Sequence, residues 1–188
     1  LYISTFRKDL LNNPSVKPMY ETEKLLLPIV FNFCKRKNLK FAILPGEEDS
    51  SSQNNYYKNL LKSKNFFLYK RNINKSYNRI DSSLFLVNID SSLGYEALSR
   101  FNKVGFFNFF SYRDKSFSSK LFFKSNGKFW LGFYDKRKID NILEYLYTVD
   151  NKVWKNQNFS KLNPIPYIKN NSKLNIILKN ILKELKII

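Results

Sequence analysis

Short apolar runs alternate along the chain with longer stretches in which hydrophobic residues recur at helical spacing. The apolar runs predict strands over residues 1–5, 41–44, 66–69, 84–89 and 104–107, and residues 129–131 form a further short strand or a packed loop. The longer stretches predict helices over residues 20–37, 50–62, 93–101 and 135–147, with a helical turn at 76–81. This alternation favours an α/β domain with a Rossmann-like, mostly parallel sheet of about five strands and flanking helices.

The first predicted helix is apolar on one face but contains a proline. Pro28 either kinks a helix over residues 20–37 or lies in the first turn of a helix that starts near Leu27. Cys34, the only cysteine, falls on the apolar face, so we interpret it as a buried thiol rather than a nucleophile. Trp154 is interpreted as a core or hinge residue.

Two segments do not fit the regular alternation. Residues 109–128 are aromatic and polar without clear periodicity; this loop either covers a ligand and supplies cations such as Arg113, or is a surface loop. Residues 163–166 contain two prolines and predict a stiff linker before an amphipathic helix over 172–187. We therefore expect one domain over residues 1–160, followed by a linker and a C-terminal helix over 161–188.

The stretch with the clearest chemistry is the polar turn that follows the strand at 84–89. Asp90, Ser91 and Ser92 all cap helices readily, and a predicted helix follows them. The first backbone N–H groups of a helix lack internal partners and attract anions, and the two serine hydroxyls add donors beside them. Glu96, about one turn further along, could accept hydrogen bonds from a sugar diol. Alternatively, Asp90 or Ser91 is only an N-cap and Glu96 a solvated helix residue; the turn's place at the carboxyl end of a central strand favours ligand binding.

The same residues resemble a known family. Residues 90–97, Asp-Ser-Ser-Leu-Gly-Tyr-Glu-Ala, followed by Lys-Val-Gly-Phe-Phe at 103–107, resemble the nucleotide-sugar-binding half of GT-B glycosyltransferases. The resemblance is to the surface-carbohydrate group that builds capsule and lipopolysaccharide sugars, including Kdo-type transferases, and it covers residues 1–146. Where Kdo-type members carry a His-Pro pair, this chain has Leu44-Pro45-Gly46 and no histidine, which departs from the family pattern.

The resemblance implies a donor nucleotide-sugar site and a glycan or glycolipid acceptor. The implied donor-binding residues are Asp90, Ser91, Ser92, Gly94 and Glu96, with Arg7 and Arg113 as cations for the leaving nucleotide. The general base would come from the other GT-B domain, and the terminal helix would cross back to it. Because residue 1 already lies in a predicted strand, we expect this acceptor domain to be missing upstream. Catalytic residues are therefore not assigned, and we expect little or no turnover from the chain alone.

Composition narrows the classes of function. The net charge is +18, from 33 Lys and Arg against 15 Asp and Glu, which suggests an anionic partner such as an acidic membrane surface. The chain has no histidine, which removes histidine-based triads, bases and metal sites. The acidic residues at 47–49 could bind a cation but are interpreted as favouring the dipole of the next helix. We expect no cofactor and no resident metal.

Two other functions are alternatives to a glycosyltransferase, and the net charge motivates the first of them. A basic nucleic-acid-binding module is one, although the lysines are scattered and no RNA-binding signature is present, so we expect no nucleic-acid partner. A sugar-nucleotide epimerase or hydrolase on the same scaffold is the other. No apolar run is long enough to span a membrane, and no signal peptide is evident. We expect a cytoplasmic protein that can lie at the inner membrane.

Overall fold

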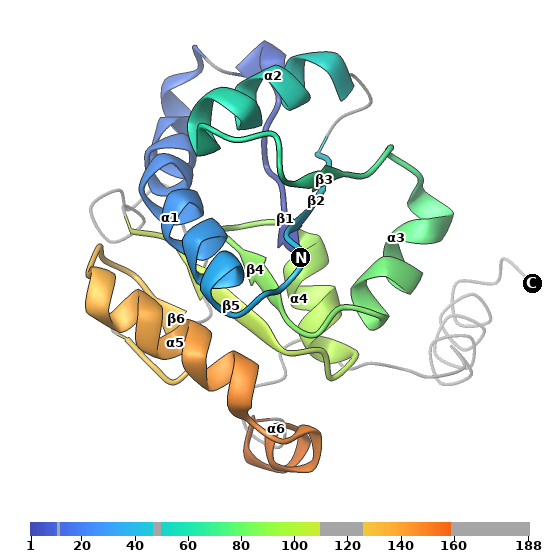
Figure 1. Cartoon of the computed structure of the whole chain (residues 1–188), viewed down its shortest axis with the longest axis vertical. Helices are drawn as coiled ribbons and strands as arrows, with labels where there is room; N and C mark the ends of the chain where they lie inside the picture. The colour runs from blue at the N-terminus through green and yellow to red at the C-terminus, as the bar shows by residue number, and fades with distance from the viewer. Residues whose placement is uncertain (11, 47–49, 110–125, 159–188) are drawn as a thin grey trace, which may run out of the picture.

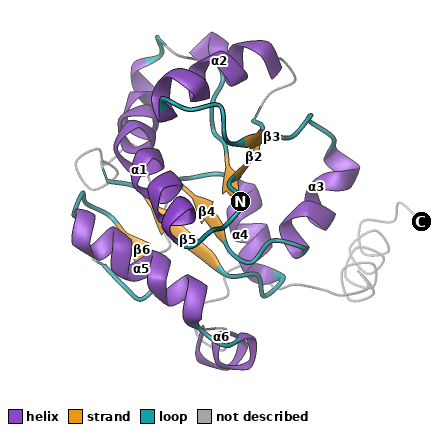
Figure 2. Ribbon diagram, in the orientation of Figure 1, coloured by secondary structure: helices purple, strands orange, loops and turns teal. Residues whose placement is uncertain are grey.

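The structure is a computed structural model that describes residues 1–10, 12–46, 50–109 and 126–158. Its centre is a sheet with the strand order β3-β2-β1-β4-β5-β6, in which every neighbouring pair is parallel (Figures 1 and 2). The strands are β1 (Tyr2–Ile3), β2 (Ala42–Leu44), β3 (Phe67–Leu68), β4 (Leu86–Asn88), β5 (Val104–Phe107) and β6 (Trp130–Leu131). The predicted Rossmann-like α/β fold is confirmed, with six strands instead of five because the segment at 129–131 joins the sheet.

Helices cover both faces of this sheet. They are α1 (Lys17–Arg36), α2 (Ser50–Leu61), α3 (Ile73–Asp81), α4 (Ser92–Ser99), α5 (Lys136–Thr148) and α6 (Asn151–Asn158), with the short 3-10 helices η1 (Lys8–Leu10) and η2 (Pro14–Val16) after β1. Helix α1 packs with α2 and α5 on one face, and α3 packs with α4 on the other (Figure 1). The strand order reverses between β1 and β4, so their carboxyl ends form the topological switch point.

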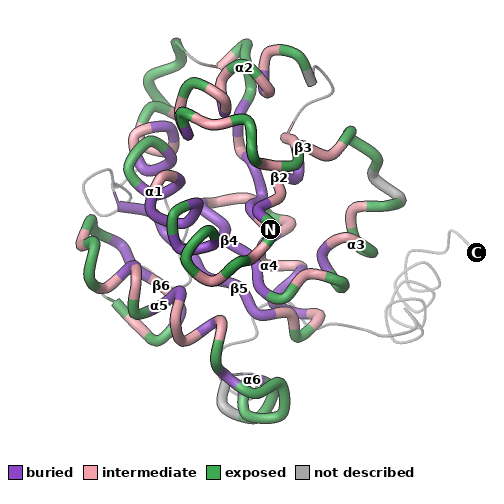
Figure 3. The backbone as a smooth tube through the Cα atoms, in the orientation of Figure 1, coloured by how far each residue is buried: buried purple, intermediate pink, exposed green. Residues whose placement is uncertain are grey.

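The core lies on both sides of the central strands. Strands β1, β4 and β5 are buried along their whole length (Figure 3), as a parallel sheet between two helical layers requires. Cys34 is buried and its thiol is free, which confirms the interpretation of a structural cysteine. Trp154 is a core residue, because it is 1% exposed and its ring centroid lies 5.2 Å from that of Phe129.

Two predicted helices differ in extent or continuity from the prediction, and α6 was not predicted. Helix α1 begins at Lys17 and contains Pro28 in its interior, so the alternative start near Leu27 is wrong. The first turns are kept in the helix because Thr22, Glu23 and Leu26 are already buried there. Helix α3 is longer than the predicted helical turn, since the side chain of Asn72 accepts a hydrogen bond from the backbone of Lys75 and caps the helix there.

Several predictions concern residues outside the described part of the chain: the acidic residues at 47–49, Arg113 with most of the loop at 109–128, and the linker and helix beyond residue 158. Among the described helices, none combines the length and apolar character needed to cross a bilayer. Within the same residues, no three His, Cys, Asp or Glu side chains come together as metal ligands would.

Candidate functional site

The polar turn after β4 is held in shape by a buried asparagine. Asn88, the last residue of β4, is 0% exposed. Its Oδ1 accepts a hydrogen bond of 3.2 Å from the backbone N–H of Ser91, and its Nδ2 donates one of 3.2 Å to the Ser91 carbonyl. One side chain thus satisfies both backbone groups of Ser91, which fixes the turn at the point where the chain leaves the sheet.

Gly94 is required by this arrangement. A Cβ atom at Gly94 would lie 2.3 Å from both the Cγ and the Nδ2 of Asn88, well inside van der Waals contact. Helix α4 can therefore approach β4 this closely only because residue 94 lacks a side chain. Gly94 thus has a packing role beneath the turn.

The turn leads directly into the N-terminus of α4. Ser91 is the N-cap residue with an extended backbone (φ −77°, ψ 135°), but its side chain makes no capping hydrogen bond. Ser91 therefore occupies the N-cap position, as one alternative predicted, but it does so without a capping bond from its side chain. Within the described part of the chain, the hydroxyls of Ser91 and Ser92 bind no other side chain, and Ser92 is exposed. The turn can offer these hydroxyls and the first helical N–H groups to an anion.

Asp90 lies between the strand and the two serines. Burial raises the pKa of its carboxyl to about 6 from an ordinary 3.8, and a hydrogen bond with Tyr95 opposes the rise. Near neutral pH the carboxylate is mostly charged and disfavours a neighbouring anion. As the pH falls through 6, more of the carboxyl is protonated and gains one O–H donor, which lessens the repulsion of an anion.

Glu96 lies on α4 and faces the neighbouring helix. Its Oε2 accepts a short hydrogen bond from the hydroxyl of Tyr77 on α3, and this bond is the main reason that the pKa of Tyr77 is raised. The interpretation of Glu96 as a solvated residue is therefore incomplete, because the carboxylate has a protein partner. A sugar diol at this position would share the carboxylate with Tyr77 or displace it.

The loop after β1 lies beside the loop after β4. Ile3 pairs with Asn88 in the sheet, so the two loops begin next to each other. The predicted cation Arg7 is exposed, and its backbone N–H and C=O are both bound to the Tyr20 hydroxyl. A Cβ at Gly46 would lie 2.9 Å from the Phe6 carbonyl, so the turn after β2 also packs against this loop. The structure brings Arg7 to the same edge of the sheet as the serines.

A buried carboxylate lies beneath the loop after β1, and sequence reasoning missed it. Glu23 of α1 is 0% exposed and accepts hydrogen bonds from Tyr2 (2.6 Å), Tyr57 (2.8 Å) and Tyr56 (2.8 Å). The Ser4 hydroxyl lies 2.6 Å from that of Tyr57 and extends the network to the carboxyl end of β1. Burial raises the pKa of Glu23 and the three tyrosine hydroxyls oppose the rise.

One signal in the sequence could have identified this carboxylate. Glu23 precedes Leu26, Val30 and Phe33 at helical spacing, so it falls on the apolar face of its helix. A charged residue at such a position is buried with partners or marks a site. The partners themselves come from β1 and α2, and only the fold brings them together.

Comparison with known proteins gives the family. The profile of a family described as "putative O-antigen biosynthesis protein" matches residues 4–184. No curated protein and no solved structure matches the chain. The match extends over nearly the whole sequence, including the strand, turn and helix that form the candidate site. The chain therefore belongs to this family of O-antigen biosynthesis proteins, which connects it with the making of surface polysaccharide.

Proposed function

We propose that the chain is the donor-binding half of a nucleotide-sugar-dependent glycosyltransferase of GT-B type, similar to the Kdo-transferase group, in surface polysaccharide or lipopolysaccharide biosynthesis. One observation carries the proposal: the Asn88-held turn lies at the switch point between β1 and β4. Open α/β sheets bind nucleotide ligands at this point. Membership of an O-antigen family supports a sugar substrate.

Each group at the turn has a role in this proposal. The hydroxyls of Ser91 and Ser92 and the first N–H groups of α4 hold the donor phosphates. Glu96 accepts hydrogen bonds from the ribose hydroxyls. Arg7 stabilises the negative charge that develops on the departing nucleotide, which is electrostatic catalysis of leaving-group departure.

The acceptor is then a glycan or glycolipid, and its deprotonation requires a base from a second domain. The proposal therefore includes an acceptor-binding domain beyond this chain and a cytoplasmic location at the inner membrane. The 33 Lys and Arg residues suit contact with anionic lipid headgroups there.

Calorimetric titration with CMP, UDP, CDP and GDP tests the proposal. We expect one nucleotide to bind with clear preference. Incubation of the preferred nucleotide's sugar conjugate with and without glycan acceptors then separates transfer from epimerisation or hydrolysis, because only a transferase needs the acceptor. Failure of all four nucleotides to bind would contradict the proposal.

The net charge of +18 supports a second candidate, a nucleic-acid-binding module. A gel-shift titration with RNA and DNA at physiological salt tests it. Tight binding that is lost steeply with added salt, and that nucleotide sugars do not compete, would favour this function over the transferase.

A further inference from the structure

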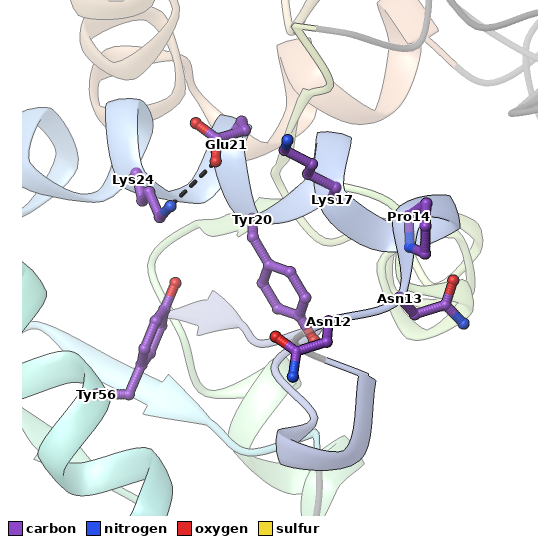
Figure 4. Close-up of a pocket in the computed structure, with 8 residues that line it drawn as sticks. All are labelled: Asn12, Asn13, Pro14, Lys17, Tyr20, Glu21, Lys24 and Tyr56. Atoms are coloured by element: carbon purple, nitrogen blue, oxygen red, sulfur yellow. Dashed lines mark hydrogen bonds and ion pairs between the residues drawn. The ribbon is translucent and has the colours of Figure 1, made fainter.

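A pocket of about 460 Å³ opens beside the loop after β1, on the α1 and α2 side of the sheet. Figure 4 shows that its walls come from the η2 loop, the first turns of α1 and one side chain of α2. It is lined by Asn12, Asn13, Pro14, Lys17, Tyr20, Glu21, Lys24 and Tyr56. None of these residues belongs to the turn after β4, so the pocket is separate from the proposed phosphate site.

The hydroxyl of Tyr56 offers the pocket a hydrogen-bond acceptor and no donor. Its hydroxyl donates to the buried carboxylate of Glu23 at 2.8 Å. Because that proton is committed to Glu23, the oxygen can only accept a hydrogen bond from a ligand. The hydroxyl of Tyr20 has both its functions occupied, since it donates to the carbonyl of Arg7 at 3.0 Å and accepts from its N–H at 3.2 Å. The pocket therefore selects a ligand that donates to Tyr56, as a sugar hydroxyl does.

The aromatic rings beside this acceptor are held rigidly. The ring of Phe6 stacks on that of Tyr56 with centroids 4.4 Å apart and an interplanar angle of 32°, and it meets Tyr20 edge-on at 6.3 Å. Phe6, which is 2% exposed, packs against the ring of Tyr56 from inside the protein, and the amides of Asn12 and Asn13 line the pocket where they can bind sugar hydroxyls.

The charged groups of the pocket favour an anionic sugar. Lys24 is paired with Glu21 at 3.0 Å, which neutralises both. Lys17 is exposed and forms no ion pair with any carboxylate of the described residues. The pocket lining thus includes one ammonium group that no carboxylate of the described residues neutralises.

We propose that this pocket binds one sugar ring that carries a carboxylate or phosphate group, with Tyr56 accepting from a ring hydroxyl and Lys17 facing the anion. The inference rests on the proposed function only in that the substrate is a glycan. It concerns the sugar and not the nucleotide.

Titration followed by NMR tests the proposal with glucuronic acid, glucose 1-phosphate, glucose and inorganic phosphate as probes. Both anionic sugars should bind more tightly than glucose or phosphate alone. Tyr56→Phe keeps the ring and removes the acceptor, so the Kd for each sugar should rise about fivefold. Lys17→Gln should remove the preference for the anionic sugars over glucose. Lys152→Gln on α6, an equal change of charge on an exposed residue, should leave all four affinities unchanged.

Several results would overturn the proposal: no sugar binding, phosphate binding as tightly as glucose 1-phosphate, or wild-type affinities in the Lys17→Gln protein. If Tyr56→Phe does not fold, Lys17→Gln still decides. The preferred nucleotide titrated into the same variants should bind as it does to the wild type, because Ser91, Ser92 and Glu96 are intact. Loss of sugar binding with nucleotide binding retained would overturn this inference and leave the proposed function standing.

Discussion

The two loops that meet at the switch point are both built on buried polar side chains, but they use them differently. Beneath the loop after β1, the carboxylate of Glu23 and three tyrosine hydroxyls bind one another inside the protein. Beneath the loop after β4, Asn88 directs both of its amide atoms to the backbone of Ser91. Within the described residues, the hydroxyls of Ser91 and Ser92 bind no other side chain, and Ser92 is exposed.

This difference separates polar groups that hold the fold together from those that we propose bind a ligand. In the Glu23 network, side chain binds side chain, so the carboxylate and the protons of the three tyrosine hydroxyls are used within the protein. In the Asn88 turn, a buried side chain satisfies the backbone and frees the neighbouring serines. Mutation of Glu23 should therefore mainly change stability, whereas mutations at the turn after β4 should also change nucleotide binding.

The largest effect is expected at Glu23. Glu23→Ala leaves three buried hydroxyls without their acceptor and should lower the free energy of unfolding by about 3–5 kcal/mol. Urea unfolding measures the change. Glu144→Ala provides the control, because this exposed partner of Lys37 should contribute about 1 kcal/mol or less. A loss at Glu23 no larger than the loss at Glu144 would contradict the structural role of the network.

Gly94→Ala should have the next largest effect. The added methyl group would collide with the side chain of Asn88, and the buried site leaves little room for adjustment. We expect a loss of about 1–3 kcal/mol in unfolding free energy. In an Asn88→Ala background the same change should cost less, because the Cγ and Nδ2 atoms that it meets are gone. Additive losses in this double-mutant cycle would show that the two residues do not pack as described.

Asp90 should produce a smaller and pH-dependent effect. Its folded pKa of about 6 lies above the ordinary value of 3.8, so the folded state binds the proton more readily. The stabilisation is complete below about pH 4 and is lost as the pH rises through 6. Asp90→Asn should therefore be more stable than the wild type by about 1 kcal/mol at pH 7, after solvent screening is allowed for, and should lose this advantage at pH 4. Unfolding at both pH values checks the sign, and equal differences would contradict it.

The sequence predicted the parts of the site that are continuous in the chain. The apolar run before Asp90 and the helix after Ser92 are local features, and a strand, turn and helix follow from them directly. The Glu23 network could not be predicted in full, because its tyrosines lie 21, 33 and 34 residues away in sequence. The bond between Tyr77 and Glu96 joins two helices for the same reason.

Other differences came from packing that outweighed local preference. Pro28 reads as a helix boundary, yet the buried face of α1 keeps the helix continuous from Lys17. Ser91 occupies the N-cap position but makes no capping bond with its side chain, and its backbone is held by Asn88 from within the sheet. Asn88 has no local signal of its own, since a polar residue near a strand end is common.

Nucleotide affinity in the Glu96→Gln protein tests the central claim most directly, with Tyr77→Phe as its matched control. Glu96→Gln weakens the hydrogen bond between the Tyr77 hydroxyl and residue 96, and Tyr77→Phe removes it. Only Glu96→Gln alters the group assigned to the ribose. We expect the Kd of the preferred nucleotide to rise about fivefold to tenfold in Glu96→Gln and to stay at the wild-type value in Tyr77→Phe. Wild-type affinity in a folded Glu96→Gln protein, or equal losses in both variants, would contradict a ribose-binding role for Glu96.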